Sequence, residues 1–153
     1  MTQQSSTPDL PAWRGFHHVA LMTPDLDATI RFYGDILGMQ IGPILPGAGA
    51  QGRHCFIRPG ETEAWGLHFF EHSEAQVFAY PETFPRFAVL PGALQHIAFA
   101  LPSEAAALAL RQRLASFGVA MTDVAHIGPI SNTLFRDNNG LLLEATWART
   151  VEG

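Results

Sequence analysis

The stretch FHHVALMTPD at residues 16–25 returns without a gap as LQHIAFALPS at residues 94–103. Each copy carries one histidine in an apolar strand pattern, then a proline, then a residue suited to begin a helix. The equivalent histidines are His18 and His96. The chain is therefore predicted to contain two copies of one supersecondary unit, which place these histidines in equivalent positions.

Periodicity extends each copy into a β-α-β-β-β unit, so an α+β fold is predicted. In both units the helix shows one apolar face and ends at a glycine, Gly38 or Gly118. The first unit is expected to have strands at 17–23, 39–45, 53–58 and 64–71, and the second at 94–101, 119–124, 130–136 and 141–148. An Asn139-Gly140 hairpin turn, where both residues tolerate positive φ, precedes the last strand.

The predicted organisation is a single domain at 14–153 after a loose polar arm at 1–13. Module one occupies 14–72 and module two 94–148. The linker at 73–93 is rich in proline and aromatic residues. We expect it to cover the exposed edges of the sheet or to form a lid over the functional site.

Composition excludes several classes of protein. The net charge is −5 with only nine lysine and arginine residues, which argues against nucleic acid as a partner. No apolar run is long enough to span a membrane. The single cysteine, Cys55, excludes an internal disulfide and fits a cytoplasmic location; it is expected to be a small buried apolar residue.

The repeat also pairs His68 with Glu144 on the last strand of each unit. A carboxylate inside an apolar strand costs several kcal/mol to bury unless it is paired or bound to a cation. Two imidazoles and a carboxylate suit a divalent transition metal and leave positions open for water or substrate. The pattern therefore predicts a metal site at His18, His96 and Glu144, with iron, zinc, nickel, manganese or cobalt as the ion.

The chain resembles the vicinal oxygen chelate superfamily, which includes glyoxalase I, extradiol dioxygenases and bleomycin-resistance proteins. The resemblance covers nearly everything from Phe16 to Trp147, and the matching stretches are His17–Leu21, Asp25–Leu26, Phe32–Gly38, Leu94–Phe99 and Phe135–Glu144. It implies a curved, cup-shaped mixed sheet with helices on its outer face. It also implies that the metal ligands fall on the same His18, His96 and Glu144.

Two positions depart from the pattern of the family. Glyoxalase-like members carry a second glutamate where this chain has His68, which is either a fourth ligand or, in the interpretation we favour, a residue of the substrate pocket. Extradiol dioxygenases tend to carry a tyrosine near the final turn, where this chain has Leu134 and Phe135. The second departure weakens a catechol dioxygenase interpretation.

The function predicted from these features is a metal-dependent lyase, isomerase or dioxygenase that acts on a small substrate with two adjacent oxygens. Glu144 is the candidate catalytic residue, and the alternative is a metal-free binding protein of the bleomycin-resistance type. A homodimer is expected because sheet edges need covering. The candidate substrate-binding residues are His54, Phe56, His68, Phe70 and His126, of which His54 and His126 are either general bases or hydrogen-bonded rim residues.

Overall fold

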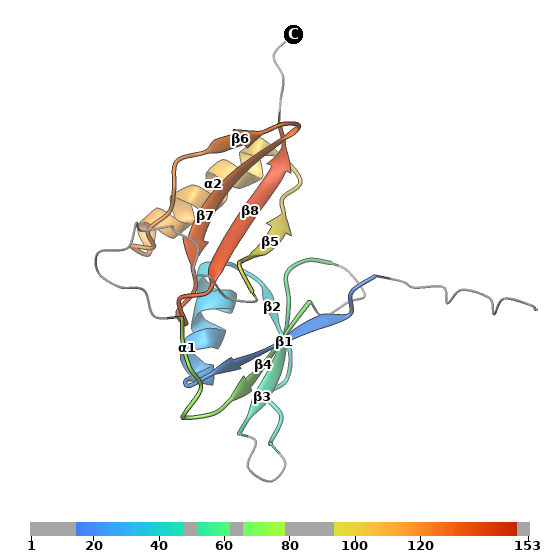
Figure 1. The fold of residues 1–153 in the computed structure, drawn as a ribbon, viewed down its shortest axis with the longest axis vertical. Coiled ribbons are helices and arrows are strands. Elements are labelled where there is room, and N and C mark those ends of the chain that lie inside the picture. Colours follow the sequence, from blue (N-terminus) through green and yellow to red (C-terminus); the bar gives the residue numbers. More distant parts are fainter. Residues whose placement is uncertain (1–14, 48–51, 62–65, 79–93, 150–153) are drawn as a thin grey trace, which may run out of the picture.

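A computed structural model describes residues 15–47, 52–61, 66–78 and 94–149 (Figure 1). The predicted N-terminal arm and most of the linker lie outside the described residues. The first module contains β1 (His18–Thr23), α1 (Leu26–Ile30), η1 (Arg31–Ile36), β2 (Gln40–Ile41), β3 (His54–Arg58) and β4 (Gly66–Glu71). The second contains β5 (Ile97–Ala100), α2 (Glu104–Ser116), β6 (Ala125–Ile127), β7 (Ile130–Arg136) and β8 (Leu142–Ala148).

The strands form two four-stranded mixed sheets of the same topology. Their orders are β1-β4-β3-β2 and β5-β8-β7-β6. In each sheet the first strand of the module pairs in parallel with the last strand, and the other neighbours are antiparallel. The α+β class and the two-module organisation are confirmed. Within the described residues, no strand of one sheet pairs with a strand of the other, and β1 and β5 are edge strands.

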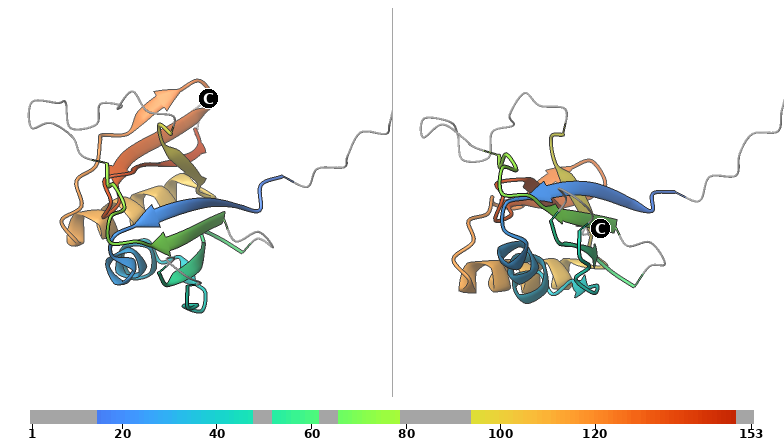
Figure 2. Two further views of the ribbon diagram at one scale, coloured as in Figure 1. Left: turned by 60° about the horizontal axis from the view of Figure 1, so that its bottom comes forward. Right: turned by 90° about the horizontal axis from the view of Figure 1, so that it is seen from below.

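The helix of each module begins at the residue that the repeat predicts. The side chain of Asp25 accepts a hydrogen bond from the Ala28 amide, and the side chain of Ser103 accepts one from the Ala106 amide. The first helix widens into a π-helical segment after Ile30, but Leu26 and Tyr33 of the predicted apolar face remain fully buried. Figure 2 shows both helices on the same side of the two sheets.

The predicted strand at 119–124 is wrong. Only Met121 forms a bridge, to Phe135, and the strand of this part of the chain is β6. Thr122 explains the interruption, because its carbonyl accepts from Arg111 and from the Thr133 hydroxyl. The Thr122 amide still donates to the Leu134 carbonyl, but the Leu134 amide bonds to the Thr122 hydroxyl, so a side-chain group replaces one of the two backbone bonds of a regular pair there.

The predicted hairpin turn exists, but only Gly140 has a positive φ, at 77°, and Asn139 does not. The Asp137 carboxylate explains the difference, since it accepts hydrogen bonds from the amides of Asn139 and Leu141 at 2.9 and 2.8 Å. These bonds stabilise a turn that needs only one left-handed residue.

Gly140 cannot be replaced without strain. Its φ is unfavourable for other residues, and a Cβ there would collide with the carbonyl oxygen of Phe78. We expect Gly140→Ala to lower the free energy of unfolding by more than about 2 kcal/mol. The matched control is Gly128→Ala, which has φ 56° and open space around the Cβ, with an expected cost of about 1 kcal/mol. Equal costs in chemical denaturation would show that the contact with Phe78 contributes nothing.

The two modules share one hydrophobic core. It contains Leu26, Tyr33 and Phe69 from module one together with Leu114 and Phe135 from module two. The Tyr33 hydroxyl donates to Asp137 Oδ2 at 2.9 Å, which is a buried hydrogen bond between the modules. Burial and the neighbouring Asp137 raise the pKa of Tyr33, so its hydroxyl stays protonated and can donate.

This junction predicts a pH dependence of stability. Burial raises the pKa of Asp137 from 3.8 to about 6, although hydrogen bonds from Leu141, Tyr33 and Asn139 lower it. The folded chain therefore holds a proton that the unfolded chain releases, and the free energy of unfolding falls as pH rises from about 4 to about 6. The contribution of this group is at most about 3 kcal/mol. Denaturation across this range should show a smaller decrease in Asp137→Asn; an unchanged decrease would contradict the assignment.

Candidate metal centre

Module one gathers its predicted site residues on one face of its sheet. In the strand register, Ala20 is paired with His68, Met22 with Phe70, and Phe56 with His68. Because paired residues share a face, the side chains on this face are those of His18, Ala20, Met22, His54, Phe56, His68 and Phe70. Met22 is 51% exposed, so part of this face is open to solvent.

The histidines of this face are packed among phenylalanine rings. The Phe56 ring stacks on His68 with centroids 3.7 Å apart, and His54 stacks on Phe70 at 5.1 Å. His54 Nδ1 lies 2.8 Å from His68 Nε2, at hydrogen-bond distance. The sequence placed these four residues in a substrate pocket, and the structure brings them together.

His68 lies at the centre of this group. Burial, together with the smaller effect of the charges of His54 and His18, lowers its pKa to about 4. The ring is therefore neutral near pH 7, with one N–H group and one lone pair. Its ring centroid lies 5.4 Å from that of His18, which places the two imidazoles next to each other.

His18 has a neighbour that strand alternation did not predict. Alternation along a strand would direct His17 away from His18, but His17 precedes β1, and its Nδ1 lies 2.8 Å from His18 Nδ1. The contact leaves His18 Nε2 as the nitrogen that can serve as a ligand. The strand pattern could not reveal the contact because it applies only within the strand.

Module two brings together the other two predicted ligands. His96 Nε2 lies 3.0 Å from Glu144 Oε2, and Asn132 Nδ2 donates to Glu144 Oε1 at 2.9 Å. Ala98 is paired with Glu144 across the parallel strands, so a small side chain lies beside the carboxylate. Glu144 is only 8% exposed, whereas the His96 side chain is one-third exposed. An imidazole nitrogen and a carboxylate oxygen therefore lie side by side, and the partly exposed imidazole leaves the access that a catalytic metal site needs.

The three predicted ligands do not meet within one chain. No group of three or more histidine, cysteine, aspartate or glutamate side chains is placed to hold a metal ion within residues 15–47, 52–61, 66–78 and 94–149. The structure instead contains two partial sites, the histidine face of module one and the His96–Glu144 pair of module two. The donor atoms fit a divalent transition metal, but each sheet provides only part of the set.

The structure does not bring His126 to either partial site. It is paired with Ser131 across β6 and β7, and its Nδ1 lies 2.8 Å from the Ser131 hydroxyl. Ser131 and Asn132 are consecutive strand residues, so their side chains point to opposite faces. His126 therefore lies on the opposite face from Glu144.

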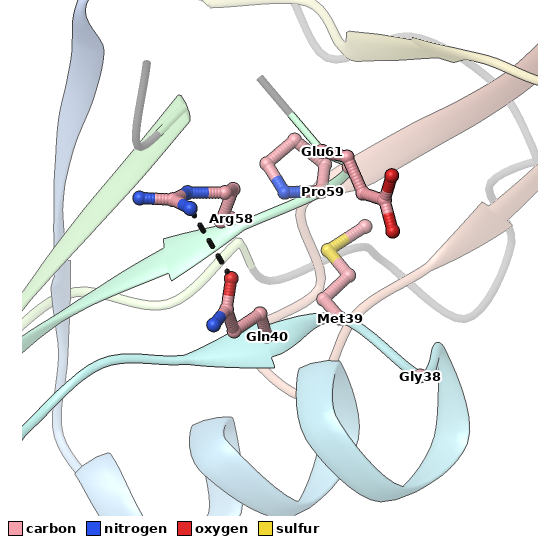
Figure 3. A pocket seen from close by; sticks show the side chains of 7 residues that line it. Gly38, Met39, Gln40, Arg58, Pro59 and Glu61 are labelled. Carbon is pink, nitrogen blue, oxygen red and sulfur yellow. Dashed lines mark hydrogen bonds between the residues drawn. The ribbon is translucent and has the colours of Figure 1, made fainter. Parts of the chain in front are cut away.

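Two arginines of β3 and its approach, Arg53 and Arg58, have protein partners. Arg53 bonds to both oxygens of Glu71 and both oxygens of Asp27. Its hydrogen bonds hold the pKa of Glu71 below its usual value. Arg58 donates to Gln40 at 3.3 Å beside a cavity of about 330 Å³ (Figure 3). That cavity also contains Met39 and Glu61 but none of the predicted ligands.

A second cavity lies on the histidine face of module one. Its volume is about 270 Å³, and its lining is formed by Ala20, Met22, Phe70 and Glu71. Ala20 and Met22 follow His18 on the same face of β1. A small apolar group of a ligand therefore has space on this face, beside Phe70.

The fold, the repeat and the partial sites agree with one family of proteins. A family model described as the Glyoxalase/Bleomycin resistance protein/Dioxygenase superfamily matches residues 15–145. The chain belongs to this superfamily. Comparison with curated proteins finds no match.

Solved structures show the same fold. A glyoxylase/bleomycin resistance protein/dioxygenase domain from Frankia sp. EAN1pec is 27% identical, with a TM-score of 0.70, over 90% of this chain and 100% of that one. Lactoylglutathione lyase from Agrobacterium tumefaciens is 20% identical, with a TM-score of 0.62, over 90% and 96%. TnmS3, an antibiotic binding protein from Streptomyces sp. CB03234, is 17% identical, with a TM-score of 0.65, over 92% and 100%. These relatives thus include an enzyme and a binding protein.

No helix in the described part of the chain is long and apolar enough to cross a membrane.

Proposed function

We propose that this protein is a metal-dependent enzyme acting on a small substrate with two adjacent oxygen atoms, and that it works as a homodimer in the cytoplasm. The observation that carries the proposal is the His96–Glu144 pair, whose donor atoms lie 3.0 Å apart on a partly open sheet face. Such a pair supplies two of the ligands that a catalytic metal site needs. The superfamily to which the chain belongs supports the same class of function.

The third ligand is His18 of a second copy of the chain. Two observations support this arrangement. One chain does not group His18 with His96 and Glu144 among its described residues. In addition, β1, which begins at His18, and β5, which begins just after His96, are edge strands of open sheets. A symmetric dimer that brings β1 of one copy beside β5 of the other would form two complete sites.

When bound, a divalent metal would act as a Lewis acid toward the two substrate oxygens. The protein contributes the remaining parts. His18, His96 and Glu144 hold the ion, and Glu144 moves a proton to or from the substrate. Phe56, Phe70 and the neutral His68 line the apolar side of the pocket, where they exclude water from the substrate.

Elemental analysis of the purified protein tests the proposal. We expect about one transition-metal ion per chain in the wild type and almost none in His96→Ala. The metal-loaded protein should also bind acetohydroxamate, a small chelator with two adjacent oxygens, and the metal-free protein should not. A wild-type protein that takes up no metal from a mixture of divalent ions would overturn the proposal.

A metal-free binding protein is the second candidate function. The stacked rings of Phe56, His68 and Phe70 favour it, because they form an aromatic surface that suits a planar ligand without a metal. Under this alternative, a planar aromatic compound would bind equally well with and without a chelator present. Binding that disappears with the chelator would exclude this candidate.

A further inference from the structure

Asn132 hydrogen-bonds the Glu144 carboxylate oxygen that does not face His96. Its side-chain amide donates to Oε1 at 2.9 Å, while Oε2 faces His96 Nε2 at 3.0 Å. Asn132 is 6% exposed and Glu144 is 8% exposed, so water has little access to replace this bond. The carboxylate is thereby held with one oxygen bound to the protein and the other directed at the partner ligand.

The same arrangement occurs in module one. His54 Nδ1 lies 2.8 Å from Nε2 of His68, which is the repeat equivalent of Glu144. The strand register shows that the two contacts are equivalent. His54 is paired with Phe70, two residues after His68, and Asn132 is paired with Thr146, two residues after Glu144. Both modules therefore support the residue at this position by a diagonal bond from the preceding antiparallel strand.

We infer that Asn132 is a positioning residue, which orients Glu144 so that Oε2 is presented to the metal. The inference rests on the proposed function and adds a residue to it. Residues that hydrogen-bond a metal ligand fix its orientation and its basicity, and their loss typically lowers metal affinity by about 10- to 100-fold. An amide suits the role because its NH₂ group only donates, so it binds Oε1 without competing for the metal.

Cobalt(II) is the probe for the test, because its visible absorption reports both the affinity and the ligand geometry. We expect Asn132→Ala to weaken cobalt binding by about 10- to 100-fold and to change the absorption bands. Asn132→Leu roughly keeps the side-chain volume and should weaken cobalt binding in the same way. It provides the test if the alanine variant does not fold. Asn132→His copies the donor of module one and should recover most of the affinity.

Ser131→Ala is the matched control. Ser131 precedes Asn132 on β7, is equally buried and also makes a side-chain hydrogen bond, but it lies on the opposite face. The Ser131→Ala variant should bind cobalt with the affinity and the absorption bands of the wild type. Asn132 variants that fold and bind cobalt as the wild type does would overturn the inference and leave the metal site intact. A wild type that binds no cobalt would instead overturn the proposed function together with the inference.

Discussion

Glu144→Ala is expected to lower the affinity of the protein for a divalent metal by more than about a hundredfold. The variant removes the only carboxylate among the three predicted ligands. Loss of a residue that only hydrogen-bonds a ligand already lowers metal affinity by about 10- to 100-fold, so loss of the ligand itself should lower it further. The loss of negative charge adds to the effect, because Glu144 offsets part of the charge of the ion.

The effect on metal must be separated from an effect on folding. Glu144 is buried against Asn132, so its removal leaves an amide without an acceptor and costs about 1–3 kcal/mol of stability. Isothermal titration with zinc, together with thermal unfolding in the absence of metal, measures the two effects separately. Glu74→Ala, an exposed carboxylate on the surface, is the control and should bind zinc as the wild type does. A Glu144→Ala variant that folds and still binds zinc as the wild type does would contradict the predicted metal site.

Tyr33→Ala is expected to lower the free energy of unfolding by about 5 kcal/mol. The Tyr33 ring is fully buried, and its centroid lies 5.1 Å from that of the Phe69 ring. The loss of a buried aromatic side chain costs about 3–5 kcal/mol. The hydrogen bond to Asp137 adds about 1–3 kcal/mol, because its loss leaves a buried carboxyl oxygen without a donor.

Tyr33→Phe separates these two contributions. It keeps the ring and removes only the hydroxyl, so it should cost about 1–3 kcal/mol. Phe117→Ala is the control, since that ring is half exposed and should cost less than about 1 kcal/mol. Because the core is shared, Tyr33→Ala should destabilise both modules in one cooperative denaturation transition. Two separate transitions in the wild type would show that the modules fold independently.

The repeat made much of the fold predictable. Two apolar strands with equivalent histidines, each followed by a helix-capping residue, predict two modules of the same topology, and the structure contains them. The failures have local causes. Thr122 interrupts a strand because its hydroxyl accepts the Leu134 amide, and Asp137 stabilises a different turn from the one that Asn139-Gly140 predicts. Side-chain bonds to the backbone leave little trace in hydrophobic periodicity.

The candidate site was only partly predictable. A repeat identifies equivalent positions, so it could predict His18, His96 and Glu144 as a set. It carries no distances, so it could not show that one chain leaves these residues in two partial sites. Asn132 was missed because a polar strand residue gives no signal by itself. The repeat alone could not reveal it, because Asn132 lies 12 residues before Glu144 whereas His54 lies 14 before His68; only the strand register makes the two positions equivalent.

The most direct test of the central claim mixes two defective chains. His18→Ala and Glu144→Ala are each expected to bind no metal at a concentration that saturates the wild type. If the site takes His18 from one chain and His96 with Glu144 from the other, half of randomly mixed dimers contain one intact site. Co-refolded chains should then bind about a quarter of the wild-type amount of metal. A mixture that binds no metal would contradict a site shared between two chains.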